Sequence, residues 1–219
     1  MSDEPMNQDR RVKRTRQVIR DAFISLIGQK GFEAVTVQEI TETADIHRST
    51  FYFHYEDKYD LMKQINEEMF QAFGHALSLP EAEAGEQCRF SWDWALVRHF
   101  EHIADNADYY KVMLGANGVP CVAKQLQRMI EQSFYRKLVR MNAQTDRSPL
   151  DAPIEALSSY VASAHLGLIE WWLDNDLVFS PSHMAKLLGN LVELGPFQTA
   201  GMIRGPSPEP YPEAPVGRR

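Results

Sequence analysis

The chain has 219 residues, of which 44% are hydrophobic and 24% charged, and its formal net charge is −7. This composition is typical of an ordinary globular protein, and the length allows one sizeable core or two small ones. The longest run without a charged residue, 156–169, is too short to cross a bilayer, so we expect a buried core helix and no membrane partner. The first residues carry acids where a signal peptide needs bases, which favours a cytoplasmic protein.

A basic segment near the start interrupts this acidic chain. It holds six cationic side chains and no acid: Arg10, Arg11, Lys13, Arg14, Arg16 and Arg20. Contact with nucleic acid depends on local potential rather than on the whole-molecule average, so the net charge does not exclude a DNA partner. The segment is either a solvated charge run or a basic arm that attracts DNA, with Arg14 as its expected contact. Residues 1–9 are expected to be disordered.

Apolar periodicity predicts an all-α fold of about nine helices and no strand. The first helix carries a stripe with three- and four-residue spacing: Val18, Ile19, Ala22, Phe23, Leu26 and Ile27. Gly31 ends this helix. Residues 58–78 are expected to form a connecting helix, and the Pro-, Ala-, Gly- and Glu-rich segment 79–87 is typical of a linker.

Two short helices are expected between these long ones. Thr36 is followed three residues later by Glu39, and this capping box predicts a helix that begins directly after the threonine. The Thr36 hydroxyl, which lies at a helix N-terminus, is also expected to contact a phosphate group. A break near Asp45 leads to a second short helix, 48–54. Such a bend is typical of a helix-turn-helix, which lays its second helix in the major groove, so residues 10–57 are expected to bind double-stranded DNA.

The outward face of the second short helix carries hydrogen-bonding side chains and no acid. Arg48 can donate two hydrogen bonds to guanine, and Thr50 can contact a thymine methyl or a base edge. Tyr52, His54 and Lys58 suit phosphate groups. Each of these residues taken alone could be an ordinary surface or core residue. Their occurrence together in one expected helix-turn-helix favours DNA contact. The expected DNA-binding residues are Thr36, His47, Arg48, Ser49, Thr50, Tyr52, His54, Lys58 and Arg14.

The segment TVQEITETADIHRSTFYFHYEDKYDLM resembles the DNA-binding domain of the TetR family of transcriptional regulators. The matching residues, in order, are Thr36, Ile40, Ala44, Ile46, Thr50, Tyr52, His54, Tyr55, Lys58 and Leu61. Asp45 stands where the family usually has Gly, and aspartate tolerates the left-handed conformation. His47 stands where the family often has Ser, so a capping hydroxyl is missing. The resemblance covers about 10–72 and implies a DNA-binding regulator, more commonly a repressor than an activator.

Five helices are expected in the C-terminal region, 88–198, from its apolar stripes and its Pro and Gly signals: 90–103, 106–114, 120–143, 153–175 and 181–194. Residues 199–219 contain five prolines and almost no large apolar side chains. Such a segment cannot bury enough surface to offset the entropy of ordering, so we expect a disordered tail.

Family resemblance implies that this region forms a homodimer through its last two large helices. Small residues recur every four positions at Ser159, Ser163 and Gly167, which leaves a smooth face for a second helix. The alternative is an intrachain core, but two such apolar helices exceed what a small domain needs to bury. The expected interface residues are Leu157, Ser159, Ser163, Gly167, Leu168, Trp171, Met184, Leu187, Leu188 and Leu191. A two-fold dimer would present two reading heads to a pseudo-palindromic operator.

Aromatic side chains are concentrated in the same region and could line an apolar pocket for a small apolar or aromatic effector. Core packing is the alternative for each of them. The candidate pocket residues are Trp94, Phe100, Tyr110, Met113, Phe134, His165 and Trp172.

The sequence therefore predicts a regulator that is released from its operator by a small-molecule effector. A constitutive or protein-responsive regulator is one alternative. An enzyme is another, but no nucleophile–base pair, phosphate-binding glycine loop or metal motif supports it. His99 and His102 with Asp105 are the best metal candidates and have no further ligand cluster, so we expect neither a metal nor a cofactor.

Overall fold

The computed structural model describes residues 4–77, 90–144 and 152–202, and every regular element in these ranges is a helix. In chain order the helices are α1 (Glu4–Lys30), α2 (Val37–Thr43), α3 (Arg48–His54), α4 (Lys58–Leu77), α5 (Phe90–Asp105), α6 (Ala107–Leu114), α7 (Pro120–Gln144), α8 (Ile154–Asp174), α9 (Pro181–Leu194) and α10 (Pro196–Thr199). The all-α prediction is confirmed.

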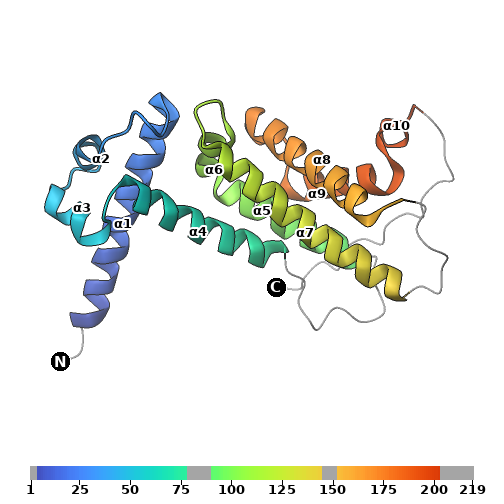
Figure 1. The fold of residues 1–219 in the computed structure, drawn as a ribbon, viewed down its shortest axis with the longest axis horizontal. Helices are drawn as coiled ribbons and strands as arrows, with labels where there is room; N and C mark the ends of the chain where they lie inside the picture. The colour runs from blue at the N-terminus through green and yellow to red at the C-terminus, as the bar shows by residue number, and fades with distance from the viewer. Residues whose placement is uncertain (1–3, 78–89, 145–151, 203–219) are drawn as a thin grey trace, which may run out of the picture.

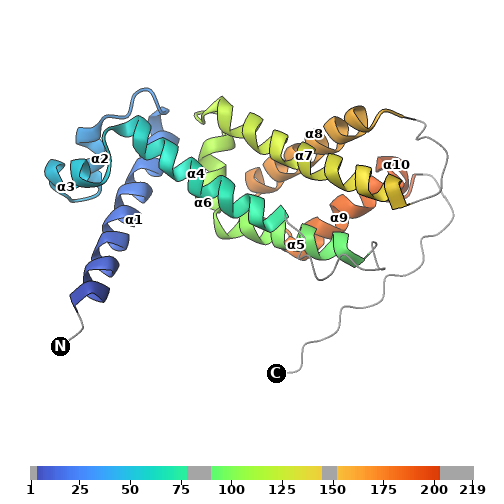
Figure 2. The same ribbon diagram turned by 60° about the horizontal axis from the view of Figure 1, so that its bottom comes forward.

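Helices α1, α2 and α3 form a head at one end of the molecule, and α4 leads from it into a larger body made of α5 to α10 (Figure 1). The same separation is visible after rotation (Figure 2). The apolar stripe of α1 builds the core of the head, because Ile19, Phe23 and Ile27 are fully buried. Gly31 ends α1 at a φ of 80°, and its N–H donates to the carbonyl of Ile27 at 2.8 Å. Such a left-handed residue is a common helix stop.

The structure differs from the sequence predictions at both ends of the chain. Helix α1 begins at Glu4, so the basic segment is a helical extension, and most of the stretch expected to be disordered is helical. Gly195 ends α9 as expected, but Pro196 opens the extra turn α10, which makes ten helices in the described ranges instead of nine. The linker 79–87 and the tail from residue 203 lie outside the described residues.

In the body, α8 packs along α7 and α9 packs against α5, while α6 contacts α1, α7 and α8. Helix α6 and the loop that follows it also connect the head to the body. The Tyr109 hydroxyl donates to the Asn66 side chain of α4 at 2.7 Å, and the Asn117 amide donates to the carbonyl of Gly28 at 3.0 Å. Gly28 permits this approach, since a Cβ there would lie 3.1 Å from Val112. None of the described helices is long and apolar enough to span a membrane.

Candidate nucleic-acid interface

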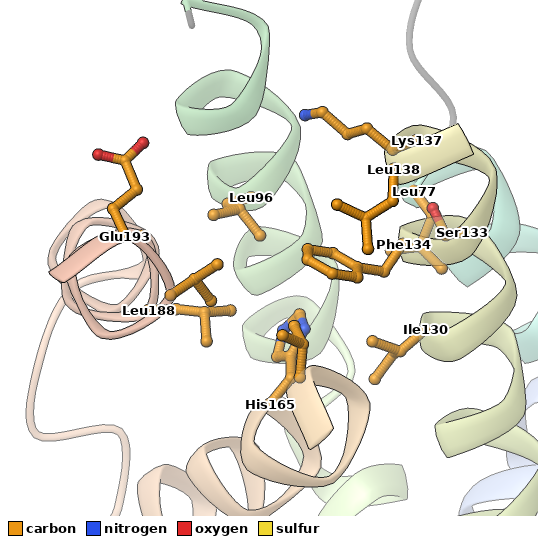
Figure 3. Close-up of a pocket in the computed structure, with 13 residues that line it drawn as sticks. Leu77, Leu96, Ile130, Ser133, Phe134, Lys137, Leu138, His165, Leu188 and Glu193 are labelled. Carbon is orange, nitrogen blue, oxygen red and sulfur yellow. The ribbon is translucent and has the colours of Figure 1, made fainter. Parts of the chain in front are cut away.

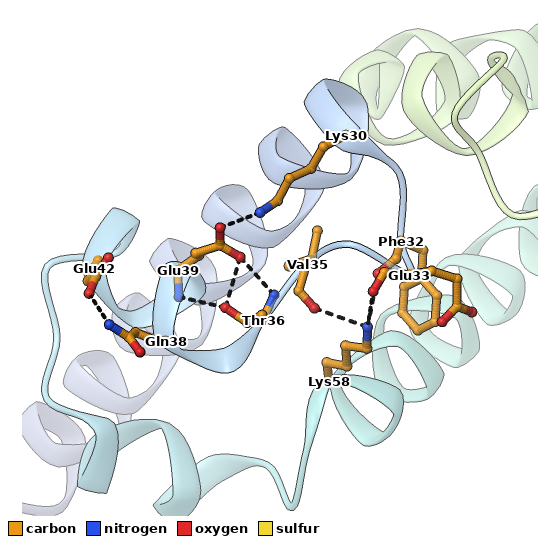
Figure 4. Close-up of polar contacts among 9 residues, drawn as sticks. All are labelled: Lys30, Phe32, Glu33, Val35, Thr36, Gln38, Glu39, Glu42 and Lys58. Atoms are coloured by element: carbon orange, nitrogen blue, oxygen red, sulfur yellow. Dashed lines mark hydrogen bonds and ion pairs between the residues drawn. The ribbon is translucent and has the colours of Figure 1, made fainter.

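The capping box at the start of α2 is present as predicted. The Thr36 hydroxyl accepts from the Glu39 N–H at 3.3 Å and donates to Glu39 Oε2 at 2.8 Å, and the Thr36 N–H donates to Oε2 at 3.0 Å (Figure 4). Lys30 at the end of α1 also binds the Glu39 carboxylate. This ammonium, followed by the Thr36 bonds, lowers the pKa of Glu39 to about 2. The hydroxyl proton of Thr36 is committed to Glu39, so a phosphate contact would have to replace that bond.

The turn between α2 and α3 has the geometry that the sequence implied. Asp45 adopts a left-handed φ of 51°, which an aspartate tolerates better than most side chains. His47 occupies the N-cap of α3 without a side-chain capping bond. Ile40 and Phe51 are fully buried and hold the two short helices together. The remaining side chains of α3 are thereby turned outward or to the edge of the head.

The exposed side chains of this region are His47, Arg48 and Ser49, together with Tyr52 at 52% and Phe53 at 79% exposure. Thr50 and His54 are half-buried. Burial, and after it the nearby Arg16 charge, lowers the pKa of His54 and favours a neutral ring. Phe53 was not among the predicted contacts. Its exposure depends on which face of α3 packs on α2, and an apolar ring in a short helix gives no sequence signal for facing outward.

Lys58 is bound within the head. Its ammonium donates to the backbone carbonyls of Phe32, Glu33 and Val35 at 3.1, 2.9 and 3.0 Å (Figure 4). It also lies 4.9 Å from the centre of the Phe32 ring. Because an ammonium has three protons, these bonds use all of its donors. Lys58 therefore fastens the start of α4 to the α1–α2 connection, and its contact with a phosphate group stays a prediction that would require these bonds to be replaced.

The basic segment divides into two sets along α1. Arg16 donates to Tyr55, Gln64 and Glu68, and its bond to the Tyr55 hydroxyl raises the pKa of Arg16. Arg20 contacts Glu68 at 3.6 Å. These two cations hold α1 against α4, and Arg16 also binds Tyr55, the residue that follows α3. Nearer the N-terminus, the side chains that stay exposed are those of Arg10, Arg11, Lys13 and Arg14.

The expected dimer residues fall into an outward and an inward group. On α8, Ser159, Ser163, Gly167 and Trp171 are exposed, with Trp171 at 44%, while Leu157 and Leu168 are half-buried. On α9, Leu187 and Leu191 are half-buried. Met184 and Leu188 are fully buried within the chain, which corrects their assignment to the surface of α9.

A cavity of about 230 Å³ lies between the end of α4 and helices α5, α7, α8 and α9 (Figure 3). Two of the predicted pocket residues, Phe134 and His165, line it. Phe100, Tyr110, Met113 and Trp172 are instead buried in the packed core and are not among its lining residues, which corrects those assignments. The side chain of Trp94 lies outside the described residues.

The histidines of α5 do not belong to a metal cluster in the described part of the chain, where no group of three or more His, Cys, Asp or Glu side chains could hold an ion. His102 Nε2 hydrogen-bonds the Tyr110 hydroxyl at 2.9 Å. The His99 ring is fully buried and lies 4.6 Å from the His165 ring, centre to centre.

Two family profiles match this chain. Residues 19–65 match the profile described as bacterial regulatory proteins, TetR family, and residues 91–194 match a TetR-type transcriptional regulator C-terminal region. The chain belongs to the TetR family. The TetR family consists of DNA-binding transcriptional regulators, which agrees with the prediction from the helix-turn-helix.

Among curated proteins, this TetR-family chain is similar to two uncharacterized HTH-type transcriptional regulators of Bacillus subtilis. It is 27% identical to YxbF over 188 residues, which cover 81% of this chain and 44% of that protein. It is 25% identical to YerO over 161 residues, which cover 72% of this chain and 54% of that protein. The chain thus spans about half the length of these curated relatives.

Solved structures show the same fold. A TetR transcriptional regulator from Streptococcus agalactiae is 26% identical, with 87% of this chain and 99% of that chain covered and a TM-score of 0.58. A putative fatty acid metabolism regulator from Clostridium perfringens is 15% identical, with 81% and 97% covered and a TM-score of 0.64. The second likeness supports the fold alone.

Proposed function

We propose that this TetR-family regulator binds a pseudo-palindromic operator as a homodimer, represses transcription from it, and is released when a small molecule occupies the cavity of the body. The observation that carries this proposal is the acid-free exposed face of α3 on a protein of net charge −7. On it, Arg48 is free of any neighbouring element and can donate two hydrogen bonds to a guanine.

The dimer is proposed to form through α8. Ser159, Ser163, Gly167 and Trp171 follow one another at helical spacing along its exposed side. A Cβ added to Gly167 would meet no atom of this chain within 4 Å, so this glycine serves no packing contact inside the described protomer. A stripe of small residues beside an exposed tryptophan suits close approach of a second α8. Two-fold pairing would repeat α3 on the partner, as two operator half-sites require.

Operator binding is tested by the salt dependence of affinity for a palindromic fragment. The logarithm of the association constant should fall with the logarithm of salt concentration by about 0.9 for each phosphate contacted. A scrambled fragment of equal length and composition is the control. Affinity that ignores salt, or equal affinity for both fragments, would contradict operator recognition.

The dimer is tested with Gly167→Arg, which adds bulk and charge to the stripe without a clash inside the protomer. We expect a dimer of the wild type and a monomer of the variant by light scattering, with operator affinity reduced. Gln125→Arg, on an exposed part of α7, is the matched control. A Gly167→Arg protein that remains a dimer would place the interface elsewhere.

The effector is proposed to act by favouring one spacing of the two heads, since a ligand shifts an equilibrium only when it binds one state better. A compound that fills the cavity should therefore weaken operator binding. If occupancy leaves operator affinity unchanged, the regulator is constitutive or protein-responsive.

A further inference from the structure

The cavity that the proposed effector would occupy has an apolar wall and polar side chains at both ends. Leu96 of α5, Ile130 and Phe134 of α7, and Val161 of α8 supply much of the wall. The His165 ring lies at one end of this space, while Lys137 and Glu193 lie at the opposite end (Figure 3). The hydrocarbon wall thus lies between the two charged residues and the imidazole.

The imidazole end carries unused hydrogen-bonding groups. Both ring nitrogens of His99 and Nε2 of His165 are buried, and in the described part of the chain they have no hydrogen-bond partner. The His99 ring packs instead against Phe73 and His165, at centre-to-centre distances of 4.3 and 4.6 Å. Of the two rings only His165 lines the cavity, and His99 packs behind it. Buried polar groups in native proteins are nearly always paired, so the unpaired nitrogen of the cavity-lining His165 indicates a partner that comes from outside the chain.

Charge at this end is disfavoured for the protein and for the ligand alike. Burial lowers the pKa of His165 to about 3, and burial together with the neighbouring His165 holds the pKa of His99 well below its usual value. Both rings are therefore neutral, and each offers one N–H donor and one acceptor nitrogen. A carboxylate or an ammonium brought here would lose its hydration without meeting an opposite charge.

The size of the space limits the ligand. An apolar cavity of about 150 Å³ holds benzene, so a cavity of about 230 Å³ has room for roughly eight or nine non-hydrogen atoms. That is the size of a substituted benzene or a short aliphatic chain.

We propose that the cavity binds a small uncharged amphiphile of about eight non-hydrogen atoms, an apolar ring or chain whose single hydroxyl or carbonyl group hydrogen-bonds the His165 imidazole. This inference rests on the proposed effector site and adds the ligand class that this site selects. The matching probe is benzyl alcohol. Toluene lacks its polar group, and benzoate and benzylammonium replace that group with a charge.

The experiment follows the methyl signals of Leu96, Ile130, Val161 and Leu188 by NMR while each of the four probes is titrated into the full chain. Benzyl alcohol should shift these signals and bind about tenfold more tightly than toluene, the ratio expected for one added hydrogen bond. Both ions should bind about tenfold more weakly than the alcohol or not at all. Tighter binding of benzoate or benzylammonium, or shifts that avoid these methyl groups, would overturn the proposal.

Two variants test the role of His165. His165→Leu keeps apolar contact and removes the polar group, so it should abolish the preference for benzyl alcohol over toluene. His165→Gln keeps an uncharged donor and acceptor and should retain it. An unchanged preference in His165→Leu would refute the hydrogen bond. If His165→Leu does not fold, the affinities of the four probes for the wild type and for His165→Gln still test the hydrogen bond.

Operator affinity of the unliganded wild type, measured separately, distinguishes the two proposals. Intact operator binding with no selective probe binding refutes the ligand class alone, whereas absent operator binding refutes the proposed function.

Discussion

Replacing Lys58 with methionine separates the two roles that this residue could have in the head. Methionine keeps an unbranched stem of similar length beside Phe32 and removes the ammonium. In the structure that ammonium donates to three backbone carbonyls of the α1–α2 connection, at 2.9 to 3.1 Å. A structural role predicts a loss of folding stability, whereas a phosphate contact predicts a loss of DNA affinity.

The size of the stability loss follows from these three bonds. The carbonyls of Phe32 and Val35 are partly buried and would lose their donor, while that of Glu33 is exposed and can take up water. A hydrogen bond with a charged partner contributes about 1.5–3 kcal/mol. Counting the two partly buried bonds near the lower end of that range, because Lys58 itself is partly exposed, we expect Lys58→Met to lower the free energy of unfolding by about 3 kcal/mol.

Urea denaturation measures this difference, with all proteins at one concentration because a dimer's stability depends on it. Lys63→Met is the matched control on the same helix. The Lys63 side chain is 71% exposed and lies 4.0 Å from Glu67, so its loss should change the free energy of unfolding by about 0.5 kcal/mol or less. Operator affinity of each folded variant is then measured over a range of salt concentrations.

The reasoning is refuted if Lys58→Met unfolds at the wild-type urea concentration and binds DNA with a reduced salt slope. Removal of one phosphate contact lowers that slope by about 1 for each protomer. Such a result would mean that the ammonium leaves the carbonyls for a phosphate when DNA binds. An unchanged salt slope with a large stability loss is the result that the structure predicts.

Three further predictions concern single side chains. Arg48→Ala should relax base preference at one position of each half-site, at about 1–3 kcal/mol, and equal weakening on all sequences in a binding-site selection would contradict this. Glu39→Gln should be less stable than the wild type above about pH 5, because the pKa of Glu39 is lowered from 4.5 to about 2. The urea midpoints of the two proteins should converge as pH falls toward 2. A difference that does not change with pH would refute the role of the Glu39 charge. The pKa of His165 is lowered from 6.5 to about 3, so the unfolded chain takes up a proton that the folded chain does not, and stability should fall as pH drops through that range. His165→Leu should reduce this slope by about one proton, and slopes equal to the wild type would show that the buried ring does not resist protonation.

Local signals in the sequence were sufficient for the helices and for the turn of the head. The capping box of Thr36 and Glu39 placed the start of α2 correctly, since both partners lie within four residues of each other. Gly31 and the pair Ser180–Pro181 marked helix ends and starts by the same kind of local chemistry. The extra turn α10 was not predicted, because a Gly–Pro pair can end one helix and, with proline in the first turn, open another.

Roles that depend on tertiary contacts could not be predicted in this way. Lys58 meets carbonyls 23 to 26 residues earlier in the chain, and nothing in its own sequence neighbourhood indicates them. A large aromatic residue such as Phe100 or Trp172 suits a packed core and a ligand pocket equally well, and only the arrangement of the helices decides. Helical spacing likewise puts Met184 and Leu188 on one face of α9 without revealing that this face packs inward.

Helix α4 joins the two halves of the proposed mechanism. At its first residue Lys58 fastens it to the head, and at its last residue Leu77 lines the cavity. Twenty helical residues span about 30 Å, and a helix this well hydrogen-bonded moves as a unit. A ligand that displaces Leu77 therefore cannot leave Lys58 in place unless the bonds to Phe32, Glu33 and Val35 break. If the three bonds of Lys58 hold, the head follows the helix, and the spacing between the two α3 helices of a dimer would change with it. The same lysine that does not need to touch DNA would thus make DNA binding responsive to the cavity.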